Sequence, residues 1–115
     1  MDNNIVFLGT EMKLNIHIDP IETDTASITM DDYDFTVEVY CNPKKVLKAT
    51  KEEDKLDKIV RIDDSNYIVL IDTNEIETGT IKCKVTAYIP DSHFEDHYRT
   101  EVVIEDTGIE VVKTL

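Results

Sequence analysis

Hydrophobic and polar residues alternate along most of this chain, and a two-residue period is typical of β-strands that bury one face. The alternation is clearest in the segments 14–18, 35–41 and 81–89. Helical periodicity is nearly absent, so we predict an all-β protein. The inward-facing positions predicted for the three clear strands are Leu14, Ile16 and Ile18; Phe35, Val37, Val39 and Cys41; and Ile81, Cys83, Val85, Ala87 and Ile89.

Less regular apolar runs predict further strands. They lie at 5–8, 26–30, 45–48, 58–62, 67–71, 98–105 and 109–113. The Lys- and Glu-rich segment 45–57 has apolar positions too irregular for a helix, and we interpret it as a short strand followed by a solvated loop.

Turn-forming residues separate the predicted strands. Asp31-Asp32 and the segment 63–66 (Asp-Asp-Ser-Asn) carry side chains that bond to their own backbone and favour turns. Asp72 is followed three residues later by Glu75, which predicts a capped single helical turn ending at Gly79. Pro90 should end its strand because proline cannot donate to a ladder.

The hairpin formed by 81–89 and 98–105 has a predicted register. Pairing Ile89 with Tyr98 places Val85 opposite Val102 and Cys83 opposite Ile104, which makes one face apolar. A slip of one residue would bring charged side chains onto that face, so we favour the first register.

About seven to nine short strands at regular spacing predict a two-sheet antiparallel β-sandwich of immunoglobulin-like type, with residues 1–115 as a single domain. A small barrel is the alternative, since the Trp of the immunoglobulin signature is missing.

Composition narrows the possible partners. The 115 residues contain 12 Lys and Arg against 25 Asp and Glu, which gives a net charge of −13. Such an acidic surface repels phosphate backbones and anionic headgroups, so we expect neither nucleic acid nor a membrane as partner.

The first residues carry acid where a secretion signal needs base, and no apolar run is long enough to span a membrane. Together with only two cysteines, this predicts synthesis in a reducing cytoplasm. Cys41 and Cys83 are interpreted as buried free thiols, and an inter-sheet disulfide is the alternative.

The segment 91–97 contains two histidines and three carboxylates. Asp91, His93, Asp96 and His97 are weak candidates for a zinc or nickel site, because imidazoles and carboxylates ligate these ions. The four-residue spacing of the histidines converges only on a helix, and this segment follows Pro90 in a hairpin loop. We therefore interpret it as a solvated loop and predict no metal.

A second acidic group combines Asp31, Asp32 and Asp34 with Asp63 and Asp64, which could hold calcium. None of them matches a calcium-loop motif, and turn chemistry explains them.

Enzyme motifs are missing. With three glycines the chain has no phosphate-cradling loop and no nucleophile elbow, and no histidine can be assigned as base to either cysteine. We therefore predict a protein that is not an enzyme, with no catalytic residues and no cofactor.

Three segments together carry a resemblance: MDDYDFTVEVY (30–40), IDDSNYIVLIDT (62–73), and GTIKCKVTAYIPD (79–91) running on to RTEV (99–102). This pattern resembles small immunoglobulin-like virion proteins of tailed bacteriophages of gut Bacteroidales, including crAss-like phages. The resemblance implies a structural role in the virion, as an accessory or decorating capsid protein or a head-fibre-base component. It supplies no catalytic residues.

The implied partners are other virion proteins, either the major capsid protein or other head or tail proteins, bound in multiple copies after synthesis in the host cytoplasm. Candidate contact regions are the loops 42–57 and 91–97 and the two chain ends. Alternatives are a tail or baseplate adaptor, a module that binds a glycan or another host-surface ligand with the outward Tyr40 and Tyr88 as sugar contacts, or a metal-dependent activity at His93 and His97.

Overall fold

A computed structural model of the chain describes residues 4–22 and 27–113. They form strands and two single-turn 3-10 helices, and no part of this described chain is a helix long and apolar enough to cross a bilayer. The elements are β1 (Ile5–Phe7), β2 (Glu11–His17), β3 (Ile21–Glu22), β4 (Ser27–Ile28), η1 (Met30–Asp32), β5 (Asp34–Asn42), β6 (Lys45–Glu52), β7 (Lys55–Asp57), β8 (Ile59–Arg61), β9 (Asn66–Asp72), η2 (Thr73–Glu75), β10 (Gly79–Pro90) and β11 (Tyr98–Val112).

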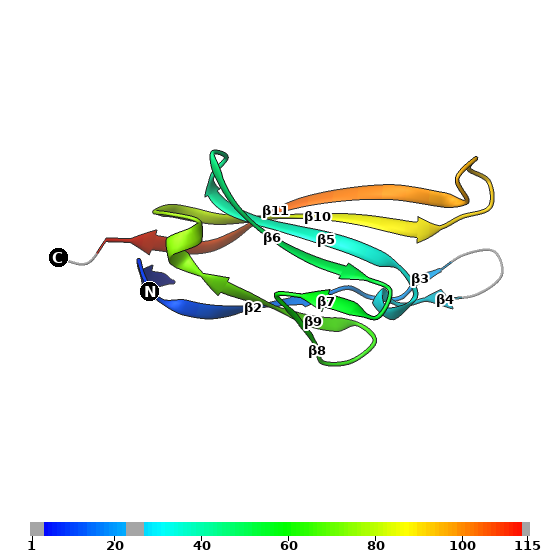
Figure 1. Cartoon of the computed structure of the whole chain (residues 1–115), viewed down its shortest axis with the longest axis horizontal. Coiled ribbons are helices and arrows are strands. Elements are labelled where there is room, and N and C mark those ends of the chain that lie inside the picture. Colours follow the sequence, from blue (N-terminus) through cyan, green and yellow to red (C-terminus); the bar gives the residue numbers. More distant parts are fainter. Residues whose placement is uncertain (1–3, 23–26, 114–115) are drawn as a thin grey trace.

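Two sheets account for most of the fold (Figure 1). The larger has the order β1-β11-β10-β5-β6-β7 and curls like half a barrel, and the smaller has the order β2-β9-β8. All strand pairs are antiparallel except β1 with β11, which run parallel over Ile5–Phe7. The predicted all-β antiparallel fold is therefore confirmed, whereas the immunoglobulin-like sandwich stays a prediction.

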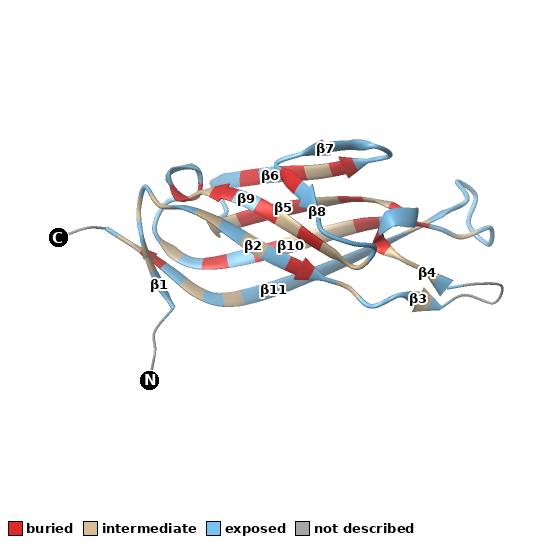
Figure 2. Cartoon of the chain, turned by 90° about the horizontal axis from the view of Figure 1, so that it is seen from below, coloured by how far each residue is buried: buried red, intermediate tan, exposed pale blue. Residues whose placement is uncertain are grey.

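One core joins the two sheets. The alternation of β5 buries Phe35, Val37 and Val39, and that of β9 buries Tyr67, Val69 and Ile71. The Phe35 and Tyr67 rings meet edge to face across the core, with centroids 5.2 Å apart. Figure 2 shows the buried positions following these strands along the middle of the molecule.

The chain passes from the larger sheet to the smaller between β1 and β2, at Gly9. The buried Thr73 hydroxyl stabilises this crossing, because it accepts from Gly9 N at 2.8 Å and donates to Thr10 O at 2.9 Å. The polar groups of the crossing are thereby satisfied inside the fold.

The predicted hairpin register is wrong by one residue. In the structure Val85 faces Val103, Ile89 faces Arg99 and Cys83 faces Glu105. The loop sets this register, because Asp91 N donates to His97 O at 2.9 Å and Pro90 then pairs with Tyr98. Of the charged side chains that the slip turns inward, Glu101 and Glu105 are exposed at an open side of the fold, and Arg99 is half-buried.

Four other predicted segments differ from the structure. Residues 45–57 form the hairpin β6–β7 instead of a strand and a loop, and 98–105 with 109–113 form the single strand β11. Of the predicted strand 26–30, residue 26 lies outside the described residues, β4 covers 27–28 and the η1 turn begins at Met30.

The predicted turn at 63–66 and the predicted cap at Asp72 are confirmed, whereas the predicted extent of the capped turn is wrong. Ser65 N donates to Asp63 Oδ1 at 2.9 Å in the β8–β9 connection, and Asp72 caps η2 by accepting from Asn74 N at 3.0 Å. The η2 turn ends by Ile76, earlier than predicted, and Glu75 pairs with Lys58 (3.5 Å) instead of with the cap backbone.

Candidate functional site

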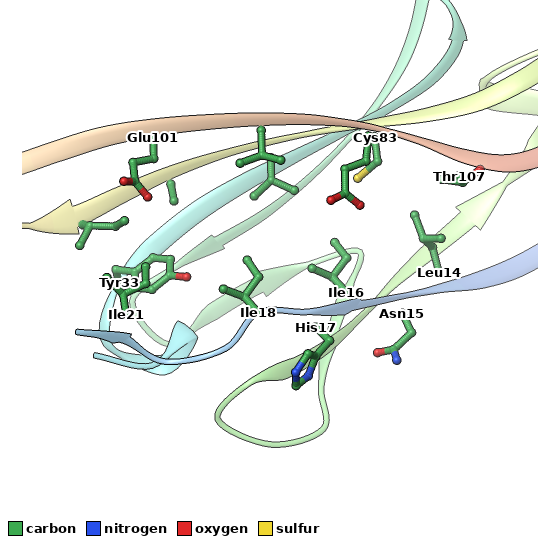
Figure 3. Close-up of a pocket in the computed structure, with 15 residues that line it drawn as sticks. Leu14, Asn15, Ile16, His17, Ile18, Ile21, Tyr33, Cys83, Glu101 and Thr107 are labelled. Atoms are coloured by element: carbon green, nitrogen blue, oxygen red, sulfur yellow. The ribbon is translucent and has the colours of Figure 1, made fainter. Parts of the chain in front are cut away.

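A groove of about 390 Å³ opens between β2 of the smaller sheet and the β10–β11 hairpin of the larger one (Figure 3). It lies where the two sheets diverge, so core side chains form its floor. Its lining residues are Leu14, Asn15, Ile16, His17, Ile18, Ile21, Tyr33, Cys83, Val85, Ala87, Ile89, Glu101, Val103, Glu105 and Thr107.

Strand β2 forms one wall. It pairs with β9 on one side, and the structure places no described strand on its other side. Its alternation turns Leu14 and Ile16 into the groove, while Asn15 and His17 point away from it in Figure 3. Leu14 remains half-buried although it is apolar and faces inward. This wall therefore presents apolar side chains beside a strand edge that can still form hydrogen bonds.

The hairpin forms the other wall. The inner face of β10 contributes Val85, Ala87 and Ile89, and the inner face of β11 contributes Glu101 and Val103 beside Glu105. Ala87 and Ile89 are buried, whereas the three β11 residues are exposed. The groove thus has an apolar floor and a rim bearing two carboxylates.

The rim carboxylates act on the groups beneath them. Burial, and secondarily the charge of Glu101, raise the pKa of Tyr33 to about 12. Burial, and secondarily Glu105, raise the pKa of Cys83 to about 11. The carboxylates of Glu101 and Glu105 are therefore close enough to Tyr33 and Cys83, in the floor of the groove, to act on them electrostatically.

The two carboxylates differ in their partners. Arg99 Nε lies 3.3 Å from Glu101 Oε1, and Arg99 also binds Asp91 through an Nη1 to Oδ2 bond of 2.9 Å. Glu105 has no ion-pair partner among residues 4–22 and 27–113. Glu105 is therefore the rim charge that remains available for a cation.

The outer edge of β11 is unpaired along most of its length. In the described chain, β1 covers only Glu110–Val112, which leaves residues 98–108 without a neighbour on that side. Within this stretch Val102, Val103 and Ile104 are 51%, 52% and 59% exposed. A long edge with an exposed apolar run is a template for pairing with another strand.

The structure brings two of the four metal candidates together. Asp91 Oδ1 accepts from His93 N at 3.0 Å and lies 3.1 Å from His93 Nδ1, while its other oxygen binds Arg99. His97 occupies a left-handed turn position with φ 63°. The described residues contain no group of three or more His, Cys, Asp or Glu side chains that could hold a metal ion.

Two of the acidic residues considered for calcium, Asp31 and Asp64, bind an arginine instead. Arg61 binds Asp31 through two hydrogen bonds of 2.9 and 2.8 Å and also contacts Asp64. The Arg61 hydrogen bond and that of the Tyr67 hydroxyl (2.6 Å) lower the pKa of Asp31 to about 2. This cluster ties η1 to the β8–β9 hairpin and is a structural ion pair.

The remaining sequence candidates separate in the structure. Tyr88 lies on β10 and is exposed. Tyr40 lies on β5 opposite Lys82, which is six residues from Tyr88 along β10. At about 3.3 Å per residue the two tyrosines lie about 20 Å apart, too far for one sugar platform.

Cys41 and Cys83 are free thiols on adjacent strands of one sheet, so an inter-sheet disulfide is excluded.

The sequence did not reveal the groove, although one signal was present. Residues 102–104 are three consecutive apolar residues, flanked by the polar runs 99–101 and 105–107, so this stretch does not alternate. Such a run leaves the inward face of the strand ambiguous, which is typical of a strand with an open side.

Comparisons of the chain with models of protein families, with curated proteins and with solved structures found no match. The proposals below rest on the groove, on the β11 edge and on the charge of the chain.

Proposed function

We propose that this protein is a non-enzymatic bacteriophage structural protein that binds other virion proteins through the open side of an immunoglobulin-like β-sandwich. The most specific form of the proposal is an accessory or decorating capsid protein, or a component of the head-fibre base. The observation that carries it is the unpaired edge of β11, with Val102, Val103 and Ile104 each more than half exposed.

Strand pairing suits such a role physically. Edge main-chain groups offer donors and acceptors in a regular row, and the alternating side chains beside them add specificity. Soluble monomers usually shorten, charge or cover a free edge. Here Glu101 and Glu105 flank the apolar run, which discourages nonspecific association and leaves the run accessible to a matched strand.

The charge of the chain supports a position outside packaged DNA. A net charge of −13 repels a phosphate backbone, so the protein can lie on a particle without binding the genome. Many copies on a lattice gain avidity when neighbouring contacts form together, and weak individual edges then suffice.

Quantitative mass spectrometry of gradient-purified phage particles carrying this gene tests the role. A copy number similar to that of the major shell protein supports capsid decoration. A few copies per particle support the head-fibre base or the alternative role of tail or baseplate adaptor. Absence from mature particles would overturn the structural proposal.

Re-addition of purified protein to particles lacking it tests the surface. Val103→Glu places a charge on the β11 edge and should abolish rebinding. Val46→Glu makes the same change on the distant β6–β7 hairpin, where Val46 is 41% exposed, and should rebind like wild type. The opposite pattern would assign the contact to the 42–57 hairpin and refute the β11 edge.

A further inference from the structure

We infer that the groove between β2 and β11 receives an extended basic segment of a partner chain, which adds as a strand to β11 and places a Lys or Arg against Glu105. The inference rests on the proposed function, because it specifies the partner that the open side of the fold would bind.

The backbone geometry favours an extended segment. Among the described strands none pairs with β11 on the outer side of residues 98–108, and none pairs with β2 on the side that borders the same groove. A strand placed along β11 would present every second side chain to the groove, about 6.6–6.8 Å apart. Glu101, Val103 and Glu105 repeat at that spacing on the inner face of β11.

The floor of the groove favours apolar side chains on the inward face of that segment. Leu14 and Val85 are core-facing and yet only half-buried, and Val103 is 52% exposed. Side chains inserted between the sheets would cover all three. Removing this apolar surface from water is the main favourable contribution expected for insertion.

The rim selects the charge of the partner. Among the described residues that line the groove none is Lys or Arg, and the ring of His17 points away in Figure 3. Glu101 already has Arg99 beside it, whereas Glu105 has no ion-pair partner in the described chain. A cation inserted beside Glu105 would complement the one rim charge that the fold itself leaves uncompensated.

A second copy of this chain is a poor occupant by the same argument. Each copy carries a net charge of −13, and the exposed strand of the second copy would bring its own Glu101 and Glu105 to an acidic rim. Like charges facing each other across paired strands are destabilising.

A charge-swap experiment tests the inference. The probe is a synthetic eleven-residue peptide in which valine alternates with threonine, with a central valine replaced by lysine and a fluorescent Gly-Ser tail. A second peptide carries glutamate in place of the lysine. Fluorescence anisotropy measures binding of both peptides to wild type, Glu105→Lys and Asp106→Lys. Asp106 lies next to Glu105 on the outer face of β11, where its Oδ1 accepts from Gly108 N at 2.9 Å, and its substitution changes net charge equally while it leaves both rim carboxylates in the chain.

We expect wild type and Asp106→Lys to bind the lysine peptide about tenfold more tightly than the glutamate peptide. Glu105→Lys should reverse that preference, a result that misfolding cannot produce. Amide chemical shifts of labelled wild type should change along β2 and along residues 98–108 on adding the lysine peptide.

Three results would overturn the inference: an unchanged preference in Glu105→Lys, shift changes confined to other elements, or sedimentation showing that two copies bury the β11 edge against each other. A further outcome is that particles contain the protein and rebind it in a Val103-dependent way while the protein shows no preference between the two peptides. That combination refutes the basic partner segment and leaves the proposed function standing. If particles lack the protein, the proposed function fails whatever the peptides do.

Discussion

Ala87, buried on the inner face of β10, lies directly across the hairpin from Glu101 on β11. A carboxylate beside a buried alanine would be costly in a closed core. Here β11 lies at the open side of the groove, so Glu101 remains exposed to solvent while Ala87 on β10 is buried. The register of the hairpin is therefore compatible with a fold that is open between β2 and β11.

Removing the Asp31 carboxylate should destabilise the fold. Asp31→Ala leaves the hydroxyl of the fully buried Tyr67 without its 2.6 Å acceptor, which should lower the free energy of unfolding by about 1–3 kcal/mol. The Arg61 ion pair adds little, since the Asp31 side chain is 38% exposed and screened by solvent. Urea unfolding at pH 7 measures the change. Asp96→Asn, in the exposed 91–97 loop, is the control and should unfold like wild type.

The same carboxylate predicts a pH dependence. The pKa of Asp31 is lowered to about 2 in the folded protein, so its contribution is complete above the ordinary aspartate value near 4 and is lost as pH falls toward 2. The stability difference between wild type and Asp31→Ala should therefore shrink between pH 4 and pH 2. A difference that stays constant over this range would show that the folded pKa is not depressed.

Lys51 is the buried cation of the core. Its ammonium donates to Tyr33 O at 2.7 Å and to Asp31 O at 3.4 Å, and the residue is 5% exposed. Lys51→Met fills similar space but leaves these carbonyls without a donor, so we expect a loss of about 1–3 kcal/mol in urea unfolding. Lys48→Met, on the exposed face of the same strand, should change stability by less than about 0.5 kcal/mol. Equal effects of the two variants would contradict the assigned role.

Gly79 cannot accept a side chain without strain. Its φ is 127°, and a Cβ there would lie 3.1 Å from Cys41 Cβ, whose thiol donates to Gly79 O at 3.2 Å. Gly79→Ala should cost about 1–3 kcal/mol from the backbone alone, with crowding in addition. Gly108 also has a positive φ (74°), but apart from its chain neighbours no described residue has an atom within 4 Å of its Cβ position. In thermal unfolding, Gly79→Ala should therefore have a lower melting temperature than Gly108→Ala. The reverse order would contradict the crowding at Gly79.

The thiols should be unreactive in the folded protein. Burial raises the pKa of both cysteines, to about 11 for Cys83, so almost no thiolate exists at pH 8. Reaction with a disulfide reagent should be slow in buffer, fast in denaturant and slower at Cys83 than at the half-buried Cys41, as measured by mass spectrometry of each labelled site. Labelling of native Cys83 at the rate of a free thiol would show that the groove floor opens readily.

The sequence by itself determined the all-β class, the clearest strands and the turn residues at Asp63 and Asp72. Alternation over 81–89 assigns each of these residues of β10 to a face, and the side chains of Asp63 and Asp72 define their turns by bonding to nearby backbone. These features depend on residues close together in the chain, where local hydrogen bonds and the two-residue period act directly.

Only the tertiary structure decided the face of β11, the open groove and the partners of the buried charges. Val102, Val103 and Ile104 allow either face to turn inward, and the Asp91 to His97 hydrogen bond selects one. The sequence also gave no sign that Arg61, 30 residues from Asp31, would occupy the centre of the acidic cluster. Such contacts join distant segments, and their free energy depends on which neighbours and how much water surround each group after the sheets pack.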